Sequence, residues 1–288
     1  MCGGPTRWRR GTSSLVSPSN RTMTKSPTST ATFSTDLTGR VAVVTGASRR
    51  RGIGAAVCRA LAAQGADVLF THWQAYDRTQ PHGADEDSPA ALEEELRAMG
   101  VRAAGLEVDL SRPESAERVL DAVLEQLGPP MILVNNAAHS TRDGYEALDA
   151  ATLDAHYAVN VRAMALLSVT FARRFDRDSG GRVINLSSGQ GVGPMPGELA
   201  YIATKGAVEA FTRTLAAEVA HKGITVNAVD PGATDTGWMT DGIKAGILRA
   251  SARGRLGQPE DAARLIAFLA SDAGEWITGQ TIHSRGDS

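Results

Sequence analysis

Four residues of this chain have the types and the spacing of a proton-transfer site: Asn160, Ser188, Tyr201 and Lys205. A tyrosine hydroxyl has a reference pKa of about 10, so it exchanges protons near neutrality only when its phenolate is stabilised. In a helix, Lys205 lies on the same face as Tyr201, and its positive charge lowers the cost of the phenolate. Ser188 can hold a carbonyl oxygen against the tyrosine. The set predicts acid–base chemistry on a carbonyl or an alcohol, with a hydride supplied from elsewhere.

Tyrosine and lysine at this spacing are a weak signal alone, because one could be a core residue and the other a solvated one. A second motif would hold the hydride donor. Residues 41–45 form an apolar run, a glycine-rich turn follows at 46–54, and a helical pattern with an apolar stripe follows the turn. Glycines let the backbone approach a pyrophosphate, and a helix N-terminus offers it free N–H groups. The segment therefore predicts a dinucleotide site rather than a purely structural turn.

With these motifs the chain resembles the short-chain dehydrogenase/reductase family, and within it the 3-oxoacyl-acyl-carrier-protein reductases and related carbonyl reductases. The similarity runs from about Leu37 to Gly286. It rests on Thr45, Gly46, Gly52, Ile53, Gly54, Asp109, Asn135, Asn136, Ala137, Asn160, Ser188, Tyr201, Lys205, Pro231, Gly232 and Thr236. The resemblance implies a single Rossmann-type, doubly wound α/β domain of about seven parallel strands with helices on both faces.

The resemblance also implies a role for each candidate residue. Tyr201 would be the general acid/base, Lys205 would bind the nicotinamide ribose and lower the tyrosine pKa, Ser188 would orient the carbonyl, and Asn160 would hold a water that links Lys205 to solvent. The residues that we expect at the cofactor are Gly46, Ser48, Arg49, Arg50, Gly52, Ile53, Gly54, His72, Asp109, Leu110, Asn136, Ala137, Tyr201, Lys205, Pro231, Gly232, Thr234 and Thr236.

The glycine-rich turn departs from the family pattern, because five residues instead of three separate Gly46 from Gly52. A second departure is Ala138, where the family more often has glycine. The lengthened turn includes arginines at 49, 50 and 51, which suit a phosphate. The expected second strand, 67–71, is followed by His72 and lacks the carboxylate that would bind a ribose 2′-hydroxyl. We therefore predict NADP(H) over NAD(H). Two alternatives are that the arginines form only a solvated loop, or that Asp77 folds back to the ribose.

The substrate wall is predicted from the segments that follow the strands. Its candidate residues are His139, Gln190, Met195, Trp238 and Met239. Segment 237–255 has several glycines and no strong period, so we expect a mobile lid there. The insertion at 74–89 is longer than its connection needs and could reach the site or a neighbouring molecule.

Three functions fit these residues. The first is reduction of a ketone or aldehyde, or its reversal, with a 3-oxoacyl thioester as the first substrate to test. The second is a steroid, sugar or secondary-metabolite dehydrogenase on the same scaffold. The third is a non-catalytic NADP(H)-sensing protein, which the complete set of four candidate residues disfavours.

The elements that must position these residues alternate along the chain, as in a parallel sheet covered by helices. Strands are predicted at 41–45, 67–71, 102–108, 131–135, 182–187, 224–229 and 280–283. Helices are predicted at 53–64, 89–99, 114–127, 152–175, 201–221 and 259–271. At 288 residues, the chain accommodates one such domain at 36–288 after a tail at 1–35.

The tail at 1–35 holds fifteen Ser or Thr and five Lys or Arg but no acid, which predicts disorder. It could be a transit peptide, or an extension before a true start at Met23. We accordingly expect a cytoplasmic protein, or an organellar one if the tail is a transit peptide. The tail's charge of +5 within an overall −2 leaves −7 for the remainder, which disfavours nucleic-acid binding.

Partners and metals are constrained by other features of the sequence. No run of about 18 apolar residues occurs, so we expect no membrane span. The two cysteines and scattered histidines form no metal-binding pattern, so we expect metal-free hydride transfer. The resemblance implies a homotetramer or a homodimer. Residues 286–288, however, depart from the glycine pair and hydrophobic residue that usually end the family's chains.

Overall fold

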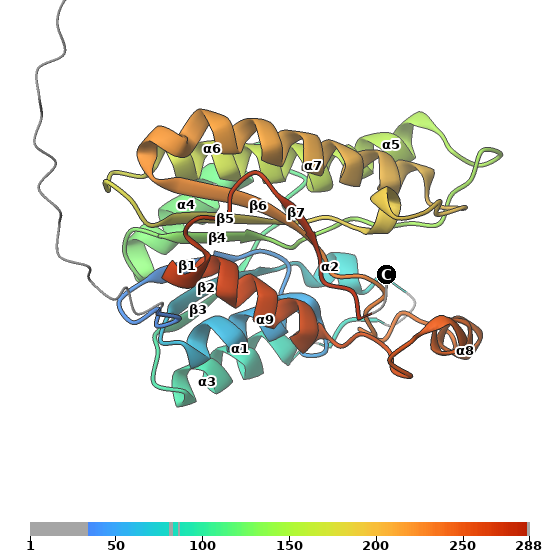
Figure 1. Ribbon diagram of the computed structural model, residues 1–288, viewed down its shortest axis with the longest axis horizontal. Helices are drawn as coiled ribbons and strands as arrows, with labels where there is room; N and C mark the ends of the chain where they lie inside the picture. Colours follow the sequence, from blue (N-terminus) through green and yellow to red (C-terminus); the bar gives the residue numbers. More distant parts are fainter. Residues whose placement is uncertain (1–33, 81–82, 86, 287–288) are drawn as a thin grey trace, which may run out of the picture. The chain divides into compact units, whose positions relative to one another are not determined.

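The computed structural model describes residues 34–80, 83–85 and 87–286, and the predicted tail lies outside this part except for its last two residues. Its strands form one parallel sheet in the order β3-β2-β1-β4-β5-β6-β7 (Figure 1). They are β1 (Val41–Val44), β2 (Asp67–His72), β3 (Ala103–Glu107), β4 (Ile132–Asn135), β5 (Gly181–Leu186), β6 (Ile224–Asp230) and β7 (Thr281–His283). The predicted doubly wound fold and its seven strands are confirmed.

Helices cover both faces of the sheet. They are α1 (Ile53–Ala63), α2 (Gln74–Asp77), α3 (Ser88–Ala98), α4 (Ser115–Gln126), α5 (Ala150–His156), α6 (Met164–Arg174), α7 (Leu199–Val219), α8 (Asp241–Ala250) and α9 (Pro259–Ala270). Shorter segments are η1 (Tyr157–Ala163), which is π-helical, and the 3₁₀ turns η2 (Gly189–Gly191), η3 (Ala220–Lys222) and η4 (Asp272–Gly274). In Figure 1, α4, α6 and α7 lie on one face, and α1, α3 and α9 on the other.

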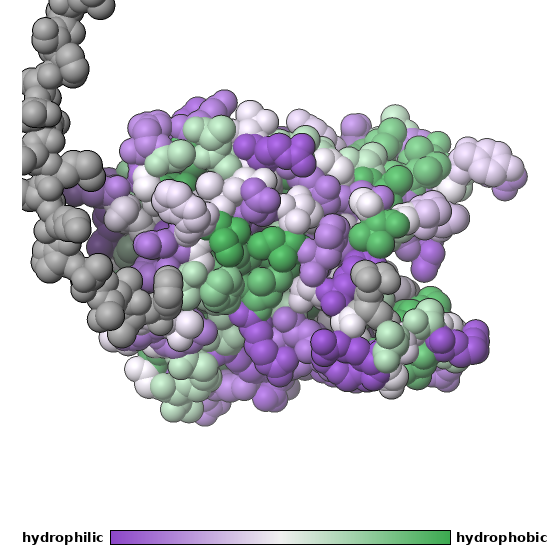
Figure 2. Space-filling model, viewed as in Figure 1, coloured by the Kyte–Doolittle hydropathy of each residue, from purple (hydrophilic) through white to green (hydrophobic). Residues whose placement is uncertain are grey.

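The central strands are buried because helices pack on both sides of them. Alternate residues of β1 point to opposite faces: Ala42 and Val44 join the core beneath α1 and α9, whereas Val43 joins the core beneath α4, α6 and α7. Hydrophilic residues dominate much of the face in Figure 2, with an apolar stretch where β7 and α9 reach the surface. Phe268 of α9 is 37% exposed, and Trp276, between α9 and β7 in the chain, is 95% exposed.

Two expected elements differ from the structure. The helix predicted at 152–175 is divided into α5, the π-helical segment Tyr157–Ala163 and α6. No helix was predicted within 237–255, but α8 forms there with Thr240 as its N-cap. Residues of α8 are not buried, and Figure 1 shows this helix projecting beside the C-terminal segment. Among the described residues, no helix has the length and apolar character needed to cross a membrane.

The carboxyl ends of all seven strands lie along one edge of the sheet, since every pairing is parallel. The strand order reverses between β1 and β4, and open α/β sheets bind ligands at such a switch point. Each predicted site segment follows a strand at this edge. These segments begin at Gly46 after β1, His72 ending β2, Asp109 after β3, Asn136 after β4, Ser188 after β5 and Pro231 after β6.

Candidate active site

The turn after β1 is shaped so that side chains are excluded from it. Gly46 has φ +74°, and a Cβ there would lie 2.6 Å from Cα of Ala137. A Cβ on Gly54 would lie 2.5 Å from the carbonyl oxygen of Gly46. Nδ2 of Asn136 donates to the carbonyl oxygens of Thr45 and Gly46, both at 2.9 Å, and so fastens the turn to the end of β4.

Helix α1 begins directly after this turn, and its N-cap, Gly52, carries no side chain to satisfy the first N–H groups. A crowded glycine turn followed by an open helix N-terminus fits a dinucleotide pyrophosphate. The longer turn is therefore compatible with the phosphate cradle that the family motif implies. Gly46, Gly52, Ile53 and Gly54 are together in it, as predicted from their spacing.

The predicted arginines separate in the structure. Nη1 of Arg49 donates to the carbonyl oxygen of Thr236 at 3.1 Å, which places Arg49 across the edge from β1 to the segment after β6. Burial lowers the pKa of Arg49, and nearby Asp77 opposes that shift. Arg50 lies 3.5 Å from the carboxylate of Glu95 in α3 instead. Of Arg49 and Arg50, only Arg49 therefore reaches across the carboxyl edge of the sheet.

His72 ends β2 as a half-buried side chain whose pKa is lowered, chiefly by burial. Its Nδ1 is buried and has no hydrogen-bond partner among the residues that the structure describes. Ser48 reaches the same place, since its Oγ accepts a hydrogen bond from the Trp73 N–H at 3.1 Å. Asp77 follows in α2 and is buried. The predicted ribose region therefore combines a neutral imidazole, a hydroxyl and one carboxylate that the sequence left as an alternative.

Asp109 and Leu110 follow β3 at the same edge. Oδ1 of Asp109 accepts from the Ser111 N–H at 2.9 Å, and Oδ2 lies 3.3 Å from Arg112. Leu110 is buried, and its carbonyl oxygen accepts a hydrogen bond from the Ser115 hydroxyl. Both residues therefore lie at the end of β3, on the sheet edge that carries the other expected cofactor residues.

Tyr201, Lys205 and Ser188 come together at the ends of β5 and α7. The Ser188 hydroxyl lies near the Tyr201 side chain, where it favours a lower tyrosine pKa. Nζ of Lys205 lies 5.5 Å from the centroid of the Tyr201 ring and donates to the carbonyl oxygen of Leu186 at 2.7 Å. Two hydroxyls and one ammonium group are thus arranged to bind and protonate a carbonyl oxygen.

Burial controls the ionisation of this pair. It raises the pKa of Tyr201 to about 12, although the nearby Ser188 hydroxyl opposes the shift. It lowers the pKa of Lys205 to about 8. The net pKa of Tyr201 is therefore raised rather than lowered, because desolvation of the phenolate dominates. The expected stabilisation of the phenolate by Lys205 stays a prediction.

Asn160 lies in the π-helical segment η1, and its amide fixes the loop after β4. Oδ1 accepts from the His139 N–H at 2.7 Å, and Nδ2 donates to the His139 carbonyl oxygen at 2.9 Å. Nδ2 also donates to the Thr204 hydroxyl at 3.0 Å, next to Lys205 in α7. Asn160 therefore connects β4 to α7, and π-helical turns often occur at such functional positions. The water predicted at this residue stays a prediction.

The turn after β6 contains the remaining predicted cofactor residues. Pro231 and Gly232 begin it, and Gly232 has φ +65°. The Thr234 hydroxyl donates to the carbonyl oxygen of Pro231 at 3.1 Å, and the Thr236 N–H donates to the Thr234 carbonyl oxygen at 3.0 Å. Thr236 in turn accepts the bond from Arg49, so this turn closes back on the glycine-rich one.

Comparisons with known proteins agree with this geometry. The sequence profile of the family described as "Enoyl-(Acyl carrier protein) reductase" matches residues 46–286. The chain belongs to the short-chain dehydrogenase/reductase family. It is 51% identical over 249 residues to the uncharacterized oxidoreductase YjdA of Bacillus subtilis, covering 86% of this chain and 96% of that protein. It is 38% identical to the 3-oxoacyl-[acyl-carrier-protein] reductase FabG of Pseudomonas aeruginosa, with 87% and 97% covered.

A solved structure is similar as well. It is a short chain dehydrogenase from Burkholderia cenocepacia in complex with NADP, with a TM-score of 0.77 and 35% identity, covering 87% of this chain and 98% of that one. This member of the short-chain dehydrogenase/reductase family is therefore an oxidoreductase that acts on CH–OH or C=O groups.

The substrate residues predicted for this short-chain dehydrogenase/reductase are only partly brought together. Met195 lies beside Ser188, with its sulfur 3.9 Å from the hydroxyl oxygen. The His139 ring packs against Tyr76 of α2, with centroids 5.4 Å apart, so the insertion at 74–89 does reach the loop after β4. The Gln190 amide turns toward α7, where its Nε2 donates to Glu209 at 2.7 Å.

The two apolar residues in the segment before α8 differ in their exposure to solvent. Trp238 is 46% exposed, and its Nε1 donates to the Thr234 carbonyl oxygen at 3.1 Å. Met239 is buried at 7% exposure. Trp238 is thus available as a wall residue, whereas the burial of Met239 gives it a packing role in this structure.

Sequence reasoning missed Asp143. Its two carboxylate oxygens accept hydrogen bonds from the N–H groups of Leu199, at 2.6 Å, and Ala200, at 2.9 Å. These N–H groups belong to the first two residues of α7, directly before Tyr201. No local sequence signal marks Asp143 as this cap, because it lies 56 residues before Leu199 in the chain. In the structure the N-cap residue of α7, Glu198, makes no side-chain cap of its own.

Sequence reasoning also missed a buried charged cluster at the ends of β6 and β7. Asp230 is 1% exposed, and its Oδ2 lies 2.8 Å from Nδ1 of His283 and 2.7 Å from Nε of Arg285. A buried carboxylate requires such partners.

Proposed function

We propose that this protein is an NADP(H)-dependent reductase that interconverts a ketone or aldehyde with an alcohol, using Tyr201 as the general acid/base. The observation that carries the proposal is the meeting of Tyr201, Ser188 and Lys205 beside a glycine cradle that fits a dinucleotide. The similarity to FabG supports a 3-oxoacyl thioester as the first substrate to test.

The chain's own residues supply the proton chemistry. When NADPH is bound, it supplies the hydride. Ser188 fixes the carbonyl oxygen beside Tyr201, and the Tyr201 hydroxyl gives that oxygen its proton as the carbon is reduced. The phenolate formed is stabilised by the ammonium group of Lys205, which the Leu186 carbonyl holds in place. Asn160 holds the loop after β4 against α7 by its hydrogen bonds with His139 and Thr204.

The preference for NADP(H) rests on the residues after β1 and β2. His72 offers no negative charge to a 2′-phosphate, and Arg49 lies at the same edge. The NADP complex of the Burkholderia protein is consistent with this preference. Asp77 is the opposing feature, because a carboxylate at a ribose favours NAD(H).

Initial rates of change in nicotinamide absorbance test the proposal. NADPH and NADH at equal concentration are compared against acetoacetyl thioester, diketones, quinones, steroids and sugars. Tyr201→Phe is expected to lose about 10²- to 10⁴-fold of the rate, which is the usual contribution of a general acid, while it still binds NADPH. Turnover that survives in Tyr201→Phe would exclude this mechanism. A preference for NADH would refute the cofactor assignment.

Several finer assignments stay predictions. The steroid, sugar or secondary-metabolite alternatives are separated by the same substrate panel, and a sensor would bind NADPH tightly without turnover. We propose α8 with its flanking residues, 237–255, as a lid over the site. The homotetramer or homodimer is tested by light scattering, and the cytoplasmic or organellar location by localisation of the full chain.

A further inference from the structure

Arg285, in the segment after β7, extends into the candidate active site. Its Cγ lies against Gly232, where a Cβ would approach it to 3.0 Å. Its Nη2 lies against Gly189, where a Cβ would collide with that nitrogen. Gly189 directly follows Ser188. The side chain therefore runs from the turn after β6 to the turn that carries the candidate carbonyl-binding hydroxyl.

A hydrogen bond of its own side chain holds Arg285 in position. Nε donates to the buried carboxylate of Asp230 at 2.7 Å, and Asp230 is held in turn by the Gly232 N–H at 2.9 Å. An arginine side chain otherwise has considerable rotamer freedom, which binding a ligand would have to remove. A buried carboxylate that fixes Nε leaves the end of the guanidinium group oriented in advance.

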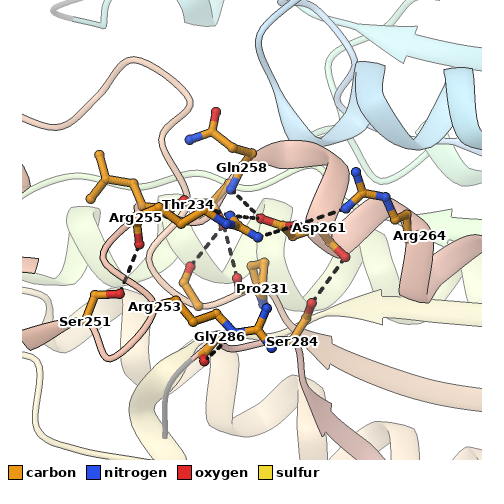
Figure 3. Close-up of polar contacts among 12 residues, drawn as sticks. Pro231, Thr234, Ser251, Arg253, Arg255, Gln258, Asp261, Arg264, Ser284 and Gly286 are labelled. Carbon is orange, nitrogen blue, oxygen red and sulfur yellow. Dashed lines mark hydrogen bonds and ion pairs between the residues drawn. The ribbon is translucent and has the colours of Figure 1, made fainter. Parts of the chain in front are cut away.

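The backbone on both sides of Arg285 is fixed as well. The Ser284 N–H donates to the Asp230 carbonyl oxygen at 2.7 Å, and the Ser284 hydroxyl donates to the Asp261 carbonyl oxygen at 3.4 Å. On the other side, Nε of Arg253 donates to the Gly286 carbonyl oxygen at 2.9 Å. Figure 3 shows Ser284 reaching Asp261 and Arg253 reaching Gly286 from the segment after α8.

The free end of the Arg285 guanidinium has the chemistry to bind an anionic ligand. Within the described part of the chain, only Nε has an assigned hydrogen-bond partner, so Nη1 and Nη2 remain as a planar pair of donors. The side chain is 26% exposed, so solvent and small molecules reach it. A guanidinium fork matches a carboxylate through two parallel hydrogen bonds, which neutral substrates cannot supply equally.

We infer that Arg285 is a specificity-determining residue that selects carbonyl substrates bearing a carboxylate near the reacting carbonyl. This inference rests on the proposed function, because it assigns the substrate class of that same site. Asp230 acts as its positioning residue. The carboxylate binds at Nη1 and Nη2 while the carbonyl oxygen of the same molecule lies at Ser188 and Tyr201.

Matched substrates that differ in charge test the inference. Acetoacetate is compared with methyl acetoacetate, and 4-oxopentanoate with its methyl ester, using the full chain and saturating NADPH. The wild type is expected to have the higher kcat/KM for each acid. In Arg285→Gln the ratio of acid to ester is expected to fall about 10- to 100-fold, mainly through KM, since hydrogen bonds to a charged group have that strength.

Two further variants separate charge from structure. Gly189→Ala keeps every charge but displaces Nη2, and it is expected to lower the acid-to-ester ratio in the same direction. Arg253→Gln also removes an arginine, together with its exposed hydrogen bond to the Gly286 carbonyl oxygen, but it leaves intact the Asp230 bond that fixes Nε of Arg285. It is therefore expected to leave the ratio within about threefold of wild type. Circular dichroism and the Kd for NADPH verify each variant's fold and cofactor site.

The failures are distinguishable. Equal losses on acid and ester in Arg285→Gln, a wild type that favours the esters, or a ratio changed as strongly by Arg253→Gln would overturn the inference alone. A raised Kd for NADPH in Arg285→Gln with an unchanged ratio would reassign Arg285 to the cofactor. Absence of Tyr201-dependent turnover with any substrate would overturn the proposed function, and this inference with it.

Discussion

Asp143 is expected to control both the stability of α7 and the position of Tyr201. Its carboxylate accepts hydrogen bonds from the first two N–H groups of that helix, at 2.6 and 2.9 Å. Tyr201 is the next residue after these two. Asp143→Ala removes both acceptors and the negative charge at the positive end of the helix dipole. The same change therefore perturbs a structural cap and the candidate acid/base.

The magnitude follows from the number of bonds and their exposure. Loss of one capping side chain costs about 1 kcal/mol, with a range of about 0.5–2. Asp143 is partly buried and caps two N–H groups, so we expect the free energy of unfolding to fall by about 2 kcal/mol. A shift of about 1 Å in a reacting group can lower the rate about 10²-fold. We therefore expect kcat to fall about 10- to 100-fold in the same variant.

Urea unfolding and steady-state kinetics with NADPH measure the two effects. Asp149→Ala is the matched control, because Asp149 caps α5 through the Thr152 N–H at 2.8 Å. The control is expected to lose about 1 kcal/mol of stability and little activity. Asp143→Asn, which keeps an acceptor but not the charge, is expected to be intermediate. If Asp143→Ala loses no more activity than Asp149→Ala, the claim that this cap positions Tyr201 is refuted.

Two more predictions test the site, one on the pH dependence and one on the glycine turn. Because the pKa of Lys205 is about 8 and that of Tyr201 about 12, the wild-type rate of carbonyl reduction should fall as pH rises through about 8, where Lys205 loses its charge. In Lys205→Arg, whose guanidinium stays charged, that limb should disappear from the pH–rate profile even though kcat is lower; a limb that persists would assign it to another group. Gly46→Ala should lose at least about 2 kcal/mol of stability and most NADPH affinity, from its φ of +74° and its approach to Ala137. Gly100→Ala has a positive φ of +91° but no atom near the added Cβ, so urea unfolding should show a loss of about 1 kcal/mol with normal NADPH binding. Comparable NADPH affinities in the two glycine variants would contradict the cradle.

The sheet and its helices were predictable because they depend on local patterns. A parallel strand buried on both faces reads as a short apolar run, and the helices between these strands have apolar stripes. The candidate triad was predictable for a related reason: Tyr201 and Lys205 share one helix, and Ser188 closely follows a strand. The π-helical segment was not predictable from composition, because residues 157–163 contain neither glycine nor proline.

The unpredicted features depend on residues that are distant in sequence but in contact in the fold. Asp143 caps a helix that begins 56 residues later, and Asp230 binds an arginine 55 residues later. Burial is likewise a tertiary property, and it moved the Tyr201 pKa in the opposite direction to the one that the local lysine suggested. Motif residues identify the reaction class because every member of a family needs them at the same spacing. The residues that distinguish substrates have no such constraint, so Arg285 becomes visible only when β6 and β7 place its guanidinium beside Gly189, the residue after Ser188.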